Sequence, residues 1–344
     1  MKRFRCDCGH PLFFESTHCT ACGADVGFDP VTAEMVTLNS SNRTGSLFDN
    51  TGDYQRCQNG VDYGVCNWLV PPSATGSLCL GCQFNRTVVD LSSARNVARW
   101  GRFEQAKKRL IYTLLSLNLP LQSRWQNEKS GLLFDFIEDQ SSNPNVPLTK
   151  VNTGHLDGII TINALEADDI AREVAKDQMN ESYRTLLGHL RHEIGHYYYE
   201  ACMAQVPGLQ EMFFSLFGDP EVDYNASLDR YYQDGPPADW SQHCISGYAS
   251  AHPLEDWAEC WSHYLMLTDT LETANAYDMV CDPSRQRDFA SRADLWRSFS
   301  VALNELNRSL GLADAYPFVI NEQVEKKLAL IDRAVSDFSK TSSR

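Results

Sequence analysis

Hydrophobic residues recur at helical spacing in several segments after residue 93. In the segment 94–115, Trp100, Phe103 and Leu110 fall near a 3.6-residue period, which predicts an amphipathic helix that ends before Pro120. The same kind of pattern predicts further helices over residues 165–178, 182–204, 253–274 and 318–338. Helices are therefore expected to dominate this part of the chain.

Shorter apolar clusters bounded by Gly, Asn and Pro predict strands over residues 131–139 and 154–163, with a turn-forming loop at 141–147. The first 90 residues have a different texture. They are rich in Gly, Asn, Ser and Thr, and we expect loops and short strands held by something other than a hydrophobic core. The chain is thus predicted to be an α+β protein with two domains, residues 1–92 and residues 93–344, the second mostly helical with a small sheet.

Composition and charge narrow the possible partners. The 344 residues are 43% hydrophobic and 22% charged, and 30 Lys+Arg against 45 Asp+Glu give a formal net charge of −15. An acidic protein is poorly suited to nucleic acid or to an anionic membrane, since both attract basic surfaces. The sequence also lacks a long uncharged apolar run and an apolar signal-peptide core. We expect a soluble, cytoplasmic protein with no nucleic-acid or membrane partner.

Cysteines are concentrated at the start of the chain, with eight of the twelve in the first 82 residues. They form two quartets: Cys6, Cys8, Cys19 and Cys22, then Cys57, Cys66, Cys79 and Cys82. Four thiolates are the complement of a closed tetrahedral zinc, and close-spaced cysteines in a reducing compartment more often bind metal than form disulfides. We predict two structural zinc ions. In the first quartet, His10 or His18 could replace one cysteine.

The charge of the cysteine-rich region indicates what it would bind. Residues 1–90 contain six Lys/Arg and nine Asp/Glu, a net charge of −3. A nucleic-acid-binding zinc ribbon would be expected to show a basic surface. This region is therefore expected either to dock a protein partner or to cap the second domain of the chain.

The sequence His192-Glu193-Ile194-Gly195-His196 carries the strongest chemical signal. On a helix, residues i and i+4 project from one face, so both imidazoles can meet one metal ion. Glu193 can then act as general base toward a zinc-activated water. Gly195 lowers helix propensity, which indicates that another element packs closely there. His189 shares this face and is expected to be a core residue or a partner of a ligand rather than a fourth ligand.

A catalytic zinc needs a third protein ligand. The segment that starts at Pro253 offers Glu255 and Glu259, one helical turn apart. One carboxylate could ligate the metal while the other orients a ligating histidine. We favour Glu255 as the ligand, with the opposite order still open. Tyr248 is the candidate donor to the developing oxyanion, with His252 and His243 as rivals.

The predicted strand 154–163 could offer a sheet edge to an extended peptide, a common way of binding main chain. His155 and Asp157 in that segment are candidate substrate contacts.

Long stretches of the chain resemble a bacterial family known as "putative zinc-binding metallopeptidases" with an N-terminal zinc-ribbon region. The stretches are CDCG, CTACG, CNWLVP, WGRFEQAKKRL, RTLLGHLRHEIGHYYYE, LFGDPEVDY, YYQDGPPADW and YASAHPLEDWAECWSHYL. This resemblance implies a zincin-like domain and peptidase activity. The segment YASAHPLEDWAECW is also similar to the third-ligand region of gluzincins, which implies Glu255 as zinc ligand, Glu259 as its orienting partner and Tyr248 as oxyanion donor.

Two hypotheses follow. The first is a zinc metallopeptidase with one catalytic and two structural zinc ions, acting on a peptide or protein substrate. The alternative is a zinc-ribbon interaction module that captures a protein partner and carries a non-catalytic or vestigial peptidase domain.

Overall fold

The computed structural model describes residues 1–38, 54–147, 150–178, 183–283 and 288–341. These residues form two compact units, Met1–Leu114 with Leu121–Ala171, and Leu115–Pro120 with Arg172–Arg344. Small sheets lie in the first unit and the second is helical, which confirms the predicted α+β class. The first compact unit contains both the cysteine-rich region and the sheet that follows it. A domain boundary between residues 92 and 93 stays a prediction.

The cysteine-rich part of the first unit consists of three antiparallel two-stranded sheets and a short helix. The elements are β1 (Phe4–Arg5), β2 (Pro11–Leu12), β3 (Val26–Asp29), β4 (Glu34–Thr37), β5 (Gln55–Arg56), α1 (Gln58–Tyr63) and β6 (Leu69–Val70). Unexpectedly, this region has a hydrophobic core of its own. Phe28 is buried between Phe14 and Trp68, with ring centroids 4.8 and 5.1 Å away. The expectation that something other than a core holds it is therefore wrong in part.

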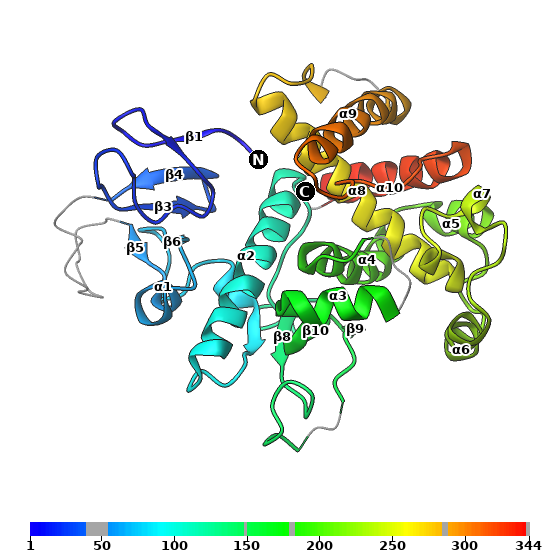
Figure 1. The fold of residues 1–344 in the computed structure, drawn as a ribbon, viewed down its shortest axis with the longest axis horizontal. Coiled ribbons are helices and arrows are strands. Elements are labelled where there is room, and N and C mark those ends of the chain that lie inside the picture. The colour runs from blue at the N-terminus through cyan, green and yellow to red at the C-terminus, as the bar shows by residue number, and fades with distance from the viewer. Residues whose placement is uncertain (39–53, 148–149, 179–182, 284–287, 342–344) are drawn as a thin grey trace. The chain divides into compact units, whose positions relative to one another are not determined.

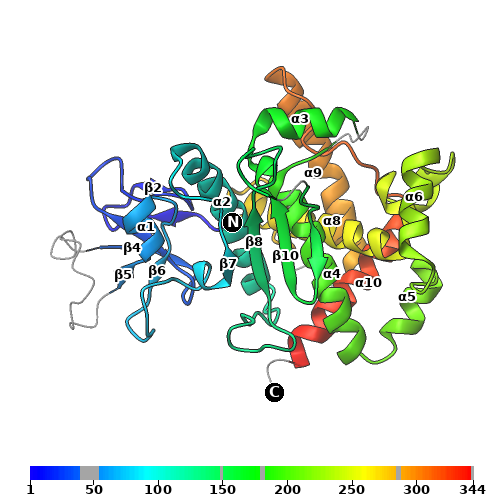
Figure 2. The same ribbon diagram turned by 90° about the horizontal axis from the view of Figure 1, so that it is seen from below.

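A long helix and a four-stranded sheet complete the first unit. The helix α2 (Ala94–Ser116) ends before Pro120, as predicted. The remaining elements are η2 (Cys82–Phe84), β7 (Asn85–Thr87), β8 (Leu133–Ile137), β9 (Gly154–Leu156), β10 (Ile159–Asn163) and η3 (Ala164–Ala167). The strand order is β7-β8-β10-β9, of which Figure 2 labels the first three strands. The Phe103 ring of α2 stacks on Phe136 of β8, with centroids 4.5 Å apart.

Residues 154–163 do not form the single strand that was predicted. They form the antiparallel hairpin β9–β10, which reverses direction at Asp157 and Gly158. Both turn residues have positive φ, 48° and 74°, a conformation that Asp and Gly adopt more readily than most residues. The predicted helix 165–178 is likewise divided, because the 3-10 turn η3 precedes α3 (Asp169–Gln178).

The second unit is made of helices (Figure 1). They are α4 (Leu186–Gln205), α5 (Leu209–Phe217), α6 (Tyr224–Asp234), α7 (Trp240–His243), η4 (Tyr248–Ala251), α8 (Pro253–Ala276), α9 (Phe289–Ser309) and α10 (Glu322–Thr341). Sequence patterns predicted α4, α8 and α10. Residue 182, the expected start of α4, lies outside the described residues, and residues 183–185 are not helical, so α4 begins later than predicted. None of the helices in the described ranges is long and apolar enough to cross a membrane.

Helices α4 and α8 pack against each other (Figure 1), and they approach closely at Gly195. A Cβ atom at this position would lie 3.0 Å from Ala258 Cα and 3.0 Å from Trp261 Cβ. The Trp257 indole also donates a hydrogen bond to the Gly195 carbonyl at 3.0 Å. The close packing predicted from this glycine is therefore confirmed, and it brings the histidine face of α4 against α8.

Candidate metal centre

The two histidines of the central motif lie on one face of α4. Thr185 caps this helix by accepting a hydrogen bond from the Gly188 amide at 3.0 Å. One turn separates His192 from His196, and their Nε2 atoms lie 3.2 Å apart. The helix therefore presents two nitrogen donors to one point.

Helix α8 supplies oxygen donors to the same point. His252 caps α8 by accepting a hydrogen bond from the Leu254 amide, and Pro253 occupies the first turn. Glu255, only 1% exposed, places Oε2 3.0 Å from His192 Nε2 and Oε1 3.5 Å from His196 Nε2.

This donor set fits zinc. One ligand atom from each of His192, His196 and Glu255 lies within 4.8 Å of the others. Donors about 2.0–2.1 Å from a tetrahedral zinc are separated by about 3.3 Å. His192 Nε2 lies 3.2 Å from His196 Nε2 and 3.0 Å from Glu255 Oε2, and His196 Nε2 lies 3.5 Å from the other Glu255 oxygen, Oε1. Two imidazoles and one carboxylate are also the ligand types of a catalytic zinc, which keeps one position for water or substrate.

Glu259 occupies the opposite side of His192. Its Oε1 lies 2.8 Å from His192 Nδ1, and its Oε2 accepts a hydrogen bond from the Ser246 hydroxyl at 2.6 Å. A carboxylate on the far nitrogen of a ligating imidazole fixes the tautomer and the ring orientation. The geometry therefore favours Glu255 as the ligand and Glu259 as the orienting partner over the opposite order.

The buried charges of the centre stabilise one another. Burial lowers the pKa of His192, but Glu255 and Glu259 raise it well above its usual value. Burial likewise raises the pKa of Glu255, yet His192 and His196 bring it well below the normal range. The pKa of Glu259 is lowered too, against burial, by His192 and Ser246. Both carboxylates are therefore ionised at neutral pH.

Glu193, the predicted general base, is 5% exposed and has a polar neighbour of its own. His189 Nε2 lies 3.4 Å from Glu193 Oε1, one turn earlier on α4. Burial raises the pKa of Glu193, while His189, His192 and His196 together lower it below the usual value. His189 thus contacts Glu193, the residue after His192. This agrees with the expectation that His189 is a neighbour of the centre rather than a metal ligand.

Two phenols lie near the ligand set. Tyr248, in η4, has its ring 5.9 Å from the His192 ring. Burial and the Glu255 charge raise the pKa of Tyr248, so its hydroxyl keeps its proton and can donate. Tyr224, at the start of α6, donates to Glu255 Oε1 at 2.5 Å. No sequence pattern marked Tyr224 as a site residue, although Tyr224 is the last residue of the LFGDPEVDY stretch.

The rival oxyanion donors have other contacts. His252 is 2% exposed; it caps α8 through Nδ1 and donates through Nε2 to the Val222 carbonyl at 3.1 Å. His243 lies exposed on α7, 3.7 Å from Asp239. Tyr248 is therefore the better candidate of the three.

The first cysteine quartet forms one sulfur cluster. Cys6 Sγ lies 3.6 Å from Cys22 Sγ, and Cys8 Sγ lies 3.7 Å from Cys19 Sγ. Sulfurs about 2.3 Å from a tetrahedral zinc are about 3.8 Å apart, so this cluster fits zinc despite the short spacing of its first pair.

Histidines stand beside this cluster rather than in it. His10 Nε2 lies 3.1 Å from the Thr20 hydroxyl, and His18 Nδ1 lies 3.3 Å from the Thr17 hydroxyl. The four clustered donors are all cysteines.

The second quartet is more deeply buried and has a cation beside it. Cys66 Sγ lies 3.6 Å from Cys79 Sγ, and the Cys79 amide donates to Cys57 Sγ at 3.4 Å. Lys108 of α2 is 3% exposed and donates to the Val65 carbonyl at 3.2 Å. Burial lowers the pKa of Lys108, but the cysteine sulfurs and Glu104 raise it overall, so the side chain stays cationic.

The predicted substrate contacts in residues 154–163 belong to the hairpin turn. His155 Nε2 accepts a hydrogen bond from the Gly158 amide at 3.0 Å, on the other side of Asp157. This contact stabilises the turn, and a role in binding substrate stays a prediction.

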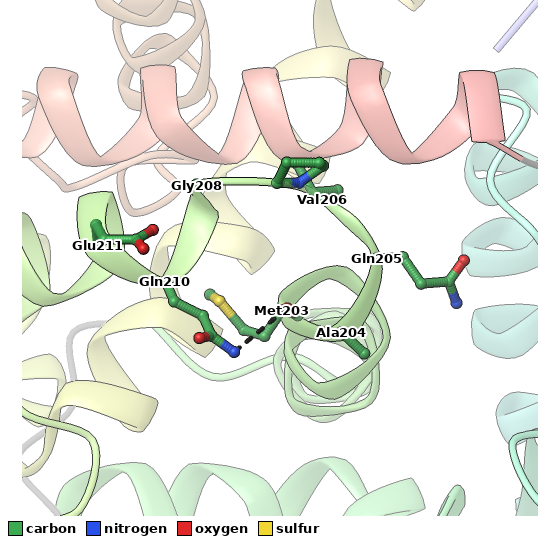
Figure 3. A pocket seen from close by; sticks show the side chains of 8 residues that line it. Met203, Ala204, Gln205, Val206, Gly208, Gln210 and Glu211 are labelled. Atoms are coloured by element: carbon green, nitrogen blue, oxygen red, sulfur yellow. Dashed lines mark hydrogen bonds between the residues drawn. The ribbon is translucent and has the colours of Figure 1, made fainter.

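Figure 3 shows a pocket of about 230 Å³ at the turn between α4 and α5. Its lining includes Met203, whose carbonyl accepts a hydrogen bond from Gln210 Nε2 at 3.4 Å. Met203 lies seven residues beyond His196, the nearer histidine of the centre, about 10 Å along an α-helix. This pocket is therefore separate from the candidate centre.

Comparison with known proteins agrees with this geometry. Residues 96–334 match the family described as "Putative zinc-binding metallo-peptidase", and residues 3–93 match a zinc-ribbon domain. Proteins of Mycobacterium bovis and Mycobacterium tuberculosis, both described as uncharacterized, are 38% identical over 357 residues, covering 100% of this chain and 99% of each relative. No solved structure matches.

Proposed function

The chain belongs to the family described as "Putative zinc-binding metallo-peptidase", and from this premise we propose that it hydrolyses peptide bonds at the α4–α8 centre. His192, His196 and Glu255 would hold the zinc, in a gluzincin-like arrangement. The observation that carries the proposal is the position of His192, whose Nε2 faces Glu255 at 3.0 Å while its Nδ1 faces Glu259 at 2.8 Å. A ligand carboxylate and an orienting carboxylate are thereby supplied from one helix.

Zinc in this position would polarise the peptide carbonyl and make a water molecule more acidic. The rest of the chemistry falls to the side chains around it. Glu193 is the general base: its buried carboxylate accepts the proton from water and passes it to the leaving amine. His189 restrains that carboxylate from the preceding turn. Ser246 and Glu259 fix the His192 ring, so that the donor geometry exists before substrate binds.

Tyr248 is the proposed donor to the oxyanion. The substrate carbonyl acquires negative charge as water attacks, and a protonated phenol can stabilise that charge by donating a hydrogen bond. The Tyr248 ring lies 5.9 Å from the His192 ring, and the Glu255 charge helps to keep its hydroxyl protonated by raising its pKa, so the donor stands beside the ligand set.

We further propose that the two cysteine clusters hold structural zinc, because four sulfurs would leave no position for substrate. Cysteines arranged as metal ligands fit a reducing compartment, and the cytoplasm is the proposed location. A peptide or protein is the proposed substrate.

The test is hydrolysis of peptide and protein libraries by the purified, zinc-loaded chain. Wild type should cleave, and Glu193→Gln should lower kcat at least about 100-fold while retaining its zinc, since it removes only the general base. Glu200→Gln, an exposed position on the same helix, is the matched control and should keep wild-type activity. A zinc-loaded wild type that cleaves nothing, or a Glu193→Gln variant with normal activity, would contradict the proposal.

A further inference from the structure

Tyr224 makes a contact that the proposed mechanism does not use. We infer that Tyr224 is a positioning residue of the zinc centre, which holds the Glu255 carboxylate against His192 and His196 through a hydrogen bond to Oε1. The inference rests on the proposed zinc site, but not on peptide hydrolysis.

The two oxygens of Glu255 have different neighbours. Oε2 lies 3.0 Å from His192 Nε2, within the range expected between two ligands of one zinc. Oε1 accepts a hydrogen bond from the Tyr224 hydroxyl at 2.5 Å and lies 3.5 Å from His196 Nε2. A hydrogen bond to a charged acceptor is short and strong. It therefore holds Oε1 in place and opposes rotation of the carboxylate away from the two histidines.

The start of α6 is built to keep Tyr224 there. Asp223 caps the helix by accepting a hydrogen bond from the Ala226 amide at 2.9 Å. The Tyr224 ring packs edge-on against His252, with centroids 5.0 Å apart. His252 in turn caps α8 and donates to the Val222 carbonyl, two residues before Tyr224. The beginnings of α6 and α8 are thus tied together, which sets the phenol opposite Glu255.

Tyr224 and Tyr248 are therefore expected to differ in what they control. Tyr224 is 38% exposed, and it covers a carboxylate that is only 1% exposed. Its hydrogen bond already exists without substrate, so its removal should change zinc binding. Tyr248, with its ring against His192, is proposed to donate to charge that develops during the reaction, so its removal should act mainly on kcat.

The test measures zinc affinity of the full chain by competition with a chromophoric chelator. Tyr224→Phe should lower the affinity of the α4–α8 zinc by about 10- to 100-fold, the usual effect of removing a partner of a metal ligand. The zinc ions of the two cysteine clusters serve as internal controls and should bind as in wild type. Ser227→Ala, which removes a hydroxyl from the same helix, should leave all affinities within about twofold.

A double-mutant cycle separates positioning from a general structural effect. In Glu255→Ala no side-chain oxygen is left to accept from Tyr224, so adding Tyr224→Phe should cause little further loss of the residual zinc affinity. Independent, additive losses would overturn the inference, and so would unchanged affinity in Tyr224→Phe alone. Zinc binding is measured without turnover, so the two proposals can fail separately. If Tyr224→Phe binds zinc more weakly but wild type cleaves no peptide, only the proposed function is refuted. If wild type cleaves peptide but Tyr224→Phe has unchanged zinc affinity, only the role of Tyr224 is refuted.

Discussion

Replacing Gly195 by alanine tests whether the α4–α8 contact sets the geometry of the centre. The new methyl group would lie 3.0 Å from Ala258 Cα and from Trp261 Cβ, and 3.3 Å from the Ala258 carbonyl oxygen. Two of these atoms belong to the α8 backbone, which cannot rotate away. Relief to an ordinary contact distance of about 3.5 Å therefore requires the helices to separate by about 0.5 Å.

The energetic balance has two opposing parts. Alanine improves helix propensity by about 1 kcal/mol relative to glycine. Overpacking in a filled core costs about 1–3 kcal/mol. The net change in the free energy of unfolding should thus lie between zero and about 2 kcal/mol of destabilisation. In Gly101→Ala, on α2, the added Cβ meets Val65 at an ordinary 3.6 Å, so only the gain of about 1 kcal/mol should appear.

Urea denaturation and zinc competition together provide the assay. The free energy of unfolding of Gly195→Ala should be about 1–3 kcal/mol lower than the value expected from the helix propensity of alanine alone. It should also bind the α4–α8 zinc more weakly, since the His192–Glu255 pair spans the two helices. A Gly195→Ala variant as stabilised as Gly101→Ala, with unchanged zinc affinity, would refute the reasoning.

Two further predictions concern the first unit. Lys108→Met removes the buried cation beside the thiolates of the second cysteine cluster, so this variant should release zinc from the cluster to a chelator about 10-fold faster or more. Lys129→Met, at an exposed position, should release zinc at the wild-type rate. The hydrogen bond from Arg99 lowers the pKa of Asp168 in the folded state. The pair should therefore stabilise the fold at pH values above about 3.9, the ordinary pKa of Asp, and this effect should be lost as the pH falls through the lower pKa of the folded state. Asp168→Asn should therefore cost about 2 kcal/mol in urea denaturation at pH 7 and much less at acidic pH; an equal cost at both would contradict it.

The candidate centre was predictable from sequence where one helix determines it. Spacing of four residues places His192 and His196 on one face, and the same rule pairs Glu255 with Glu259. The spacing does not say which glutamate faces which histidine nitrogen, because that depends on how α4 crosses α8. Gly195 was a usable signal of this crossing, since a glycine inside a helix is unfavourable unless something packs against it.

Tyr224 could not be found in this way. It reaches Glu255 through the contact of α6 with His252, which is tertiary, and α6 buries none of its residues, so its sequence shows no strong apolar face. Helix α9 was missed despite a signal, since Phe289, Ala293 and Trp296 recur at helical spacing and are buried. The hairpin at Asp157-Gly158 was also signalled, because Asp-Gly between apolar runs is a typical turn.

Zinc content and peptide hydrolysis, measured on the same samples of wild type, Glu255→Ala and Glu259→Ala, test the central claim most directly. Wild type should bind one zinc for each of the three donor groups and cleave peptide. Glu255→Ala should bind one zinc fewer and be inactive, whereas Glu259→Ala should bind that zinc more weakly. A Glu255→Ala variant that keeps all three zinc ions and wild-type hydrolysis would contradict the account.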